Sequence, residues 1–154
     1  MSIILDGTTG ITSPTGGAPA FSAYSSATQT ITANTWTKVS LNTKNFDTNS
    51  NFDATTNYRF TPTVAGYYLL SWAIYTTNTA TNAYSQLYKN GTGVAYGGTS
   101  QPTGGVGSQI STGSFLISMN GSTDYLELYG YSGSTNITSG ATVTYMTGAF
   151  VRSL

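Results

Sequence analysis

The sequence predicts an all-β protein, a sandwich of short strands, and three observations carry this prediction. Residue types that rank poorly in helices dominate the 154-residue chain, with 29 Thr, 19 Ser, 11 Asn, 18 Gly and 12 Tyr. Apolar residues alternate with polar ones at a period of two, which is typical of strands buried on one face. Turn-forming dipeptides separate these runs at the short intervals found in β-sandwiches.

The strands follow from this alternation in chain order. Every second residue of a strand faces the same side, so apolar residues two positions apart share a face. The groups that share a face are Thr37, Val39 and Leu41; Phe115, Ile117 and Met119; Leu126 and Leu128; and Val143, Tyr145, Ala149 and Val151.

Two dipeptides and two longer segments predict the connections and the domain limits. Asn90-Gly91 and Asn120-Gly121 are strong signals for hairpins or tight turns, because Asn and Gly tolerate a positive φ. Residues 97–113 are rich in Gly and polar residues and are predicted to form a long flexible loop. Residues 1–18 hold several Gly and little apolar sequence, so they are predicted to be an N-terminal arm before one folded domain over residues 19–154.

Segment 67–75 differs from the other predicted strands because both of its faces are apolar. One face carries Tyr68, Leu70, Trp72 and Ile74, and the other carries Tyr67, Leu69, Ala73 and Tyr75. A sandwich buries only one face of a strand, so the second face needs another cover. A subunit interface is favoured over a loop folded across that face, since aromatic residues are enriched at interfaces.

The composition excludes several classes of function. Five basic and five acidic residues give zero net charge, which leaves no basic surface for nucleic acid. No apolar run approaches the roughly 20 residues that a membrane helix needs, and the N-terminus lacks the basic and apolar regions of a signal peptide. Without His and Cys, there can be no Ser-His-Asp or Cys-His catalysis and no disulfide framework or zinc ribbon. We therefore expect a protein made in the cytoplasm that binds no cofactor and does not insert into membranes.

The five acidic residues could still support a glycosidase or a calcium site. Asp124 and Glu127 are three residues apart, so they would point to opposite faces of one strand. Asp47, Asp53 or Asp124 could supply oxygen ligands for calcium, but turn-forming and hydrogen-bonding roles are favoured. No catalytic or metal-binding residue is therefore assigned, and a two-carboxylate hydrolase is the least favoured alternative.

The tyrosines suggest carbohydrate binding, because aromatic faces stack on sugars. Most of them lie in strand-like runs, which favours packing in the core and at interfaces. Tyr96, Tyr129 and Tyr131 lie near Gly-rich segments and are the candidates for exposed ligand contacts.

A family resemblance follows from the spacing of Leu41, Asp47, Phe52, Phe60, Gly66, Tyr68, Leu70 and Trp72. This spacing resembles the signature of the globular head of the complement component C1q, and segments 87–91, 114–119, 124–128 and 146–151 follow in the family's order. That family shares a trimeric jelly roll with the tumour necrosis factor superfamily, so the resemblance implies a jelly-roll sandwich and a homotrimer. Leu41 and Leu70 stand where the family usually has Phe, and none of the family's calcium or ligand sites is carried over.

The arm carries a second resemblance. Residues 4–14 (Ile-Leu-Asp-Gly-Thr-Thr-Gly-Ile-Thr-Ser-Pro) are similar to a phrase that recurs in bacteriophage tail-fibre and other virion-surface proteins. The resemblance implies a location on the virion surface, with other virion proteins as partners and a host surface glycan as a further potential partner. The candidate anchoring residues are Ile3, Ile4, Leu5, Asp6 and Ile11.

These inferences lead to a non-enzymatic homotrimer on a bacteriophage virion, held by its arm. A capsid decoration (cement) protein and a host-binding tail-fibre tip both fit. A chain that starts at Met1 without a shaft slightly favours decoration, whereas the fibre-like phrase favours the tail. The alternative is a cellular carbohydrate-binding or adhesion module.

Overall fold

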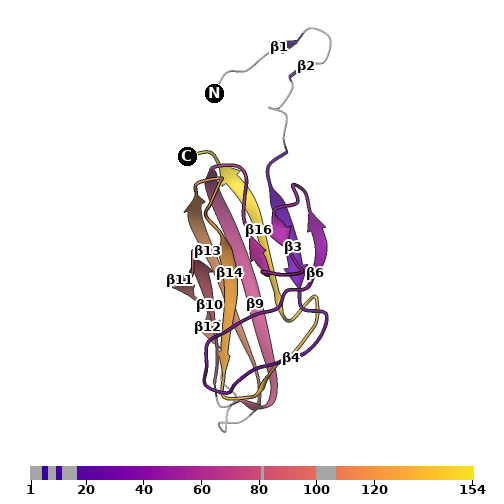
Figure 1. Cartoon of the computed structure of the whole chain (residues 1–154), viewed down its shortest axis with the longest axis vertical. Helices are drawn as coiled ribbons and strands as arrows, with labels where there is room; N and C mark the ends of the chain where they lie inside the picture. Colours follow the sequence, from indigo (N-terminus) through magenta and orange to yellow (C-terminus); the bar gives the residue numbers. More distant parts are fainter. Residues whose placement is uncertain (1–4, 7–9, 12–16, 81, 100–106) are drawn as a thin grey trace.

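The computed structural model describes residues 5–6, 10–11, 17–80, 82–99 and 107–154, and every regular element among these residues is a strand (Figure 1). Every strand pairing among them is antiparallel. The strands form two large sheets and two short two-stranded ones. The prediction of an all-β sandwich is confirmed.

The first large sheet, called here the β9 sheet, contains the longest strands. Its spatial order is β12 (Gly98–Thr99), β13 (Gly107–Met119), β9 (Gly66–Ala80), β16 (Tyr145–Arg152), β3 (Ala20–Tyr24) and β6 (Thr43–Asp47).

The second large sheet, called here the β14 sheet, faces the first across the core. Its order is β11 (Thr92–Tyr96), β10 (Ala83–Lys89), β14 (Leu126–Ser132), β8 (Arg59–Phe60) and β7 (Phe52–Asp53), and β5 (Thr37–Lys38) also pairs with β14. The two short sheets are β1 (Leu5–Asp6) with β2 (Gly10–Ile11), and β4 (Gln29–Thr30) with β15 (Asn136–Ile137).

The core between the sheets has an aromatic cluster near the start of β9. Phe21 stacks on Phe60 with ring centroids 4.3 Å apart, and Phe60 meets Tyr68 edge to face at 5.5 Å. All three side chains are fully buried. The Tyr68 hydroxyl donates a hydrogen bond to the Val64 carbonyl at 2.7 Å, and burial raises the pKa of Tyr68 to about 12. Tyr68 therefore stays neutral and satisfied inside the core.

The hairpin between β10 and β11 has the conformation that Asn90-Gly91 predicts. Asn90 and Gly91 have φ values of 53° and 79°, and successive positive φ values match the twist of a tight antiparallel hairpin. Asn120-Gly121 also forms a turn, with Gly121 at a φ of 70°, but it connects β13 to β14 in the opposite sheet. The tight turn is confirmed there without a hairpin.

The prediction of one long flexible loop over residues 97–113 is wrong in part. Gly98–Thr99 form β12, and β13 begins at Gly107, so the second half of this segment is strand. Gly-rich composition disfavours strands in general, but Gly113 serves a packing purpose here. A Cβ at Gly113 would lie 2.2 Å from Cζ2 of Trp72, so only glycine lets the two strands approach over the indole.

The two ends of the sandwich domain lie at the same pole. Ala20, which starts β3, pairs with Ala149 near the end of β16, and Arg152 pairs with Tyr67 near the start of β9. β9 then runs to the opposite pole, where Ala80 pairs with Gly107 and β10 begins three residues later at Ala83. Figure 1 shows these long strands running along the sandwich.

Candidate functional site

The outward face of β9 carries an exposed apolar surface. Alternate residues from Tyr68 to Ile74 are buried in the core, as the sequence predicts. The residues between them point away from the core, and among these Leu69 is 47% exposed. A single exposed Leu is common on protein surfaces, so Leu69 is informative only together with the apolar side chains around it.

Leu69 lies in a row of apolar side chains across three strands. Its register partners are Leu116 on β13 and Ala149 on β16, and directly opposed residues of an antiparallel pair point to the same side. Leu116 is 52% exposed and Val151 is 53% exposed. We call the surface formed by Tyr67, Leu69, Leu116, Ala149 and Val151 the apolar face.

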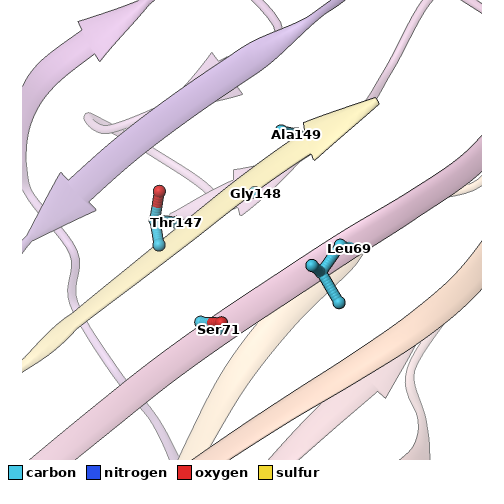
Figure 2. Close-up of a pocket in the computed structure, with 5 residues that line it drawn as sticks. All are labelled: Leu69, Ser71, Thr147, Gly148 and Ala149. Carbon is cyan, nitrogen blue, oxygen red and sulfur yellow. The ribbon is translucent and has the colours of Figure 1, made fainter. Parts of the chain in front are cut away.

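Two shallow hollows lie in and beside the apolar face. Tyr67, Leu116, Val151 and Arg152 line the first. Figure 2 shows the second, in which Leu69 and Ser71 on β9 lie beside Thr147, Gly148 and Ala149 on β16. Apart from Leu69, the residues that line the second hollow have small side chains.

A bulge in β16 shapes one border of the apolar face. The register with β9 shifts between Phe150 and Arg152, which leaves Val151 unpaired and exposed. The Arg152 guanidinium carbon lies 5.4 Å from the centre of the Tyr67 ring, within range of a cation–π contact. One cation therefore lies at the rim of an otherwise uncharged surface.

The structure separates the four residues that the sequence nominates for an interface. Tyr67 and Leu69 belong to the apolar face. Ala73 is 1% exposed within one chain, between its register partners Thr112 and Tyr145, so it offers no surface to a partner. Tyr75 is half-buried, and its backbone N–H donates a hydrogen bond to Thr144 Oγ1.

Sequence reasoning missed Leu116, Ala149 and Val151 as members of this surface. For Leu116 a signal was present, because Phe115, Leu116 and Ile117 are three consecutive apolar residues, as in segment 67–75. Phe115 is also 38% exposed. Within the described part of the chain β13 pairs with β12 only at Ser111 and Thr112, so its edge over residues 113–119 is open.

The tyrosines nominated for ligand contact lie on the outer face of the β14 sheet. Tyr96 on β11 is 70% exposed, and Tyr131 on β14 is partly exposed. Tyr129 stacks on Tyr88 with ring centroids 3.9 Å apart. Burial, with a smaller contribution from the nearby Glu127 carboxylate, raises the pKa of the Tyr129 hydroxyl.

Asp124 and Glu127 do not form a catalytic pair. Asp124 accepts hydrogen bonds from Asn90 and the Asn120 N–H and forms an ion pair with Lys89 at 2.8 Å. These partners, Lys89 first, hold the pKa of Asp124 below its usual range. Glu127 instead forms an ion pair with Lys38 at 3.0 Å. Each carboxylate is engaged in its own structural contact.

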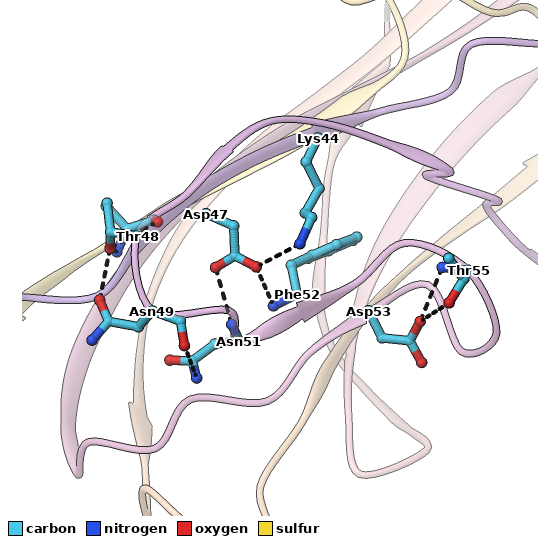
Figure 3. A network of polar contacts seen from close by, with 9 residues as sticks. Lys44, Asp47, Thr48, Asn49, Asn51, Phe52, Asp53 and Thr55 are labelled. Carbon is cyan, nitrogen blue, oxygen red and sulfur yellow. Dashed lines mark hydrogen bonds and ion pairs between the residues drawn. The ribbon is translucent and has the colours of Figure 1, made fainter.

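Asp47 and Asp53 shape turns, as the sequence predicts (Figure 3). Asp47 accepts hydrogen bonds from the backbone N–H groups of Asn51 and Phe52 and forms an ion pair with Lys44 at 3.1 Å. Asp53 accepts hydrogen bonds from the backbone N–H groups of Thr56 and Thr55, which hold its pKa far below the usual range.

The proposed anchoring residues of the N-terminal arm lie largely outside the residues that the structure describes. Ile3 and Ile4 of the proposed anchor lie outside the described residues, and Leu5, Asp6 and Ile11 are described only as backbone of the β1–β2 pair.

In the described part of the chain no three acidic side chains gather as a metal site would require. The described residues also contain no helix with the length and hydropathy of a membrane span.

Comparison with solved structures identifies the fold of the chain. No protein-family model matches the sequence, and no curated protein is a significant match. Solved structures do match. The globular domain of the zebrafish complement 1qA protein has a TM-score of 0.68 at 16% identity, over 89% of this chain and 99% of that chain. The Eiger TNF from S. frugiperda has a TM-score of 0.68 at 9% identity, over 89% and 93% of the two chains.

A third match is murine APRIL at pH 5.0, with a TM-score of 0.63 at 12% identity, over 87% of this chain and 99% of that chain. All three alignments cover most of both molecules, so the likeness concerns the complete sandwich. The chain therefore has the jelly-roll fold of complement C1q globular domains and tumour necrosis factor-like proteins, as the spacing of its aromatic residues predicted.

Proposed function

We propose that the protein is a non-enzymatic structural protein that assembles into a homotrimer through its apolar face. The exposure of Leu69, Leu116 and Val151 together on the outward face of the β9 sheet is the observation that carries this proposal. Each of these side chains is about half exposed, and covering the exposed half contributes roughly 1 kcal/mol each. The trimer is the assembly that the C1q and tumour necrosis factor resemblance implies.

The open edge of β13 supports a rotational assembly. Phe115 and Leu116 lie on this edge, and Leu116 also belongs to the apolar face. When one copy lays its β13 edge against the apolar face of the next, each copy supplies both surfaces. Such head-to-tail contacts close into a ring when the rotation fits.

The proposed place of action is the surface of a bacteriophage particle, and the phrase in residues 4–14 supports it. Capsid decoration and a tail-fibre tip remain the two locations that fit. A structural role is further supported by the acidic side chains at Asp47, Asp53, Asp124 and Glu127, which are all engaged in turns or ion pairs.

Size-exclusion chromatography with light scattering tests the assembly. The expected molar mass is three times that of the 16.1 kDa chain at micromolar concentration. A folded monomer under these conditions would rule out the homotrimer.

Removal of residues 1–18 tests the anchor. The shortened chain should keep its trimer, because the arm precedes β3 and supplies none of the apolar face. It should not be incorporated into virions, as measured by immunoblots of purified particles. Normal incorporation of the shortened protein would refute the anchoring role of the arm.

A cellular adhesion module is the second candidate, and the exposed aromatic residues on the β14 sheet favour it. Saturable glycan binding by a protein that never associates with virions would support this candidate over the first.

A further inference from the structure

We propose that the outer face of the β14 sheet carries a binding site for neutral carbohydrate, formed by Trp36, Tyr84, Tyr96 and Tyr131. We call these four residues the aromatic platform. The site goes beyond the assembly proposed above, since it uses the opposite sheet and needs neither a trimer nor a virion.

The strand register brings these rings together from distant parts of the sequence. Tyr84 on β10 pairs with Tyr131 on β14, and both lie on the side opposite to the buried residues Ala83 and Ser132. Tyr96 on β11 follows on the other side of β10, where it pairs with Gln86. Trp36 precedes β5, which pairs with β14.

The four rings contact one another in a continuous chain. The ring centroids of Tyr84 and Tyr131 are 5.9 Å apart, those of Tyr131 and Trp36 are 5.5 Å apart, and those of Trp36 and Tyr96 are 5.9 Å apart. The interplanar angles lie between 48° and 61°, so Trp36 meets Tyr96 edge to face and the other two pairs are tilted. This packing holds the rings in place before any ligand arrives, which lowers the entropy cost of binding.

The platform combines apolar ring faces with polar groups. Tyr96 is 70% exposed, and the other three rings are each partly exposed. The Tyr131 hydroxyl lies 3.4 Å from Asn34 Oδ1, which adds an amide beside the phenol groups. A sugar ring has the matching character, because its C–H face packs on an aromatic ring while its hydroxyls form hydrogen bonds at the edges.

The charges around the platform favour a neutral ligand. Glu127 and Lys38 lie next to it on β14 and β5, and they neutralise each other through their 3.0 Å ion pair. Arg59 lies on the far side of β14, where its guanidinium carbon is 4.5 Å from the centre of the Tyr125 ring. Because Lys38 and Glu127 are paired with each other, they offer no free cation to a sulfate or carboxylate group, which favours a neutral sugar.

The platform lies in the half of the domain that is away from the chain ends of the domain. Tyr84 and Tyr131 lie close to the ends of β10 and β14 at the pole where β9 finishes, and the domain's chain ends lie at the other pole. A chain attached by its arm would hold the platform in the distal half of the sandwich.

A glycan array and a fluorescence titration of the full chain test this site. The array carries neutral oligosaccharides of glucose, galactose, mannose and N-acetylhexosamines, together with sulfated and sialylated sets. The best neutral oligosaccharide is then titrated. Trp72 is 1% exposed and hydrogen-bonded to Ser85, so a change in tryptophan emission reports on Trp36.

We expect saturable binding of at least one neutral glycan, weakened about tenfold or more by Tyr96→Ala, which corresponds to ~1.4 kcal/mol. Tyr96→Phe should keep most of the affinity because the ring remains. Phe46→Ala is the matched control, since Phe46 is 51% exposed on the other sheet, and it should bind as the wild type does.

Four results would overturn the proposal: no neutral binding at millimolar concentration, binding of anionic glycans only, equal affinity of Tyr96→Ala and the wild type, or a changed molar mass of Tyr96→Ala. The last would identify the platform as a contact between copies. Light scattering on the same samples tests the trimer separately, so the two proposals can fail independently.

Discussion

The outer faces of the two large sheets differ in kind, although both belong to one antiparallel sandwich. The apolar face on the β9 sheet consists mainly of aliphatic side chains, of which Leu69, Leu116 and Val151 are each about half exposed. The aromatic platform on the β14 sheet consists of rings that already contact one another and carry hydroxyl or N–H groups.

This difference separates two kinds of recognition. Aliphatic side chains gain free energy mainly from removal of water by another apolar surface, and a second copy of the chain offers one. Rigid aromatic rings with polar ends gain both from stacking and from hydrogen bonds, and they lose little conformational entropy on binding. The sandwich therefore presents a surface suited to assembly and another suited to a small polar ligand.

The largest effect should come from a charge placed in the apolar face. Leu69→Asp would bury a carboxylate without a partner in each contact, so assembly should weaken by at least about a thousandfold, which is ~4 kcal/mol. Light scattering at micromolar concentration should show a folded monomer with the circular dichroism of the wild type.

The matched control is Val94→Asp, because Val94 is 38% exposed on β11 of the opposite sheet. It should remain trimeric. The distinction between the two faces would be lost if Val94→Asp dissociated the protein as completely as Leu69→Asp, or if Leu69→Asp stayed trimeric. Leu116→Ser is a milder variant that tests the same face should Leu69→Asp fail to fold.

Acid should act on the fold and not directly on the apolar face. The folded-state pKa values of Asp53 and Asp124 are depressed, so both groups stabilise the fold above their unfolded pKa of about 3.9 and lose this contribution as the pH falls through the folded values. The free energy of unfolding, measured with urea, should therefore decline below about pH 4.

Asp53→Ala isolates one of these contributions. It removes the acceptor for the Thr55 and Thr56 N–H groups and should cost about 1–2 kcal/mol at neutral pH. The difference from the wild type should shrink below about pH 4. A difference that stays constant down to pH 2 would show that the carboxylate charge is not responsible.

Salt should have the smallest effect. The apolar face contains no acidic or basic member, and Arg152 is the one cation at its rim among the described residues. Assembly should be nearly the same in 0.05 M and 1 M NaCl, where the Debye length is about 3 Å. Dissociation at the higher concentration, seen by light scattering, would mean that ion pairs hold the copies together.

The fold was accessible from the sequence because one periodicity recurs along the chain. The alternation in segment 67–75 gave both the buried residues from Tyr68 to Ile74 and the existence of a second apolar face. It could not show that Ala73 is covered within one chain, since that depends on the neighbours Thr112 and Tyr145.

Contacts between distant segments account for what the sequence did not show. From the sequence, Gly113 is predicted to be a loop residue, and only the close approach of the Trp72 indole explains a glycine in a strand at this position. Val151 becomes exposed through a bulge, and a bulge has no clear composition signal. Trp36 and Tyr84 join Tyr96 and Tyr131 only through the pairing of β10, β14 and β5, so the sequence nominated two of the four platform residues.

Strand β9 has a consequence for how the sequence can change. Its even-numbered residues from Tyr68 to Ile74 fill the interior, while Tyr67 and Leu69 form part of the outer surface. Substitutions at even and odd positions therefore alter the interior and the outer surface separately. A one-residue insertion after Leu69 would exchange the two faces for the residues beyond it, turning Trp72 outward. Length changes should accordingly be tolerated in the connections between strands and rejected within β9.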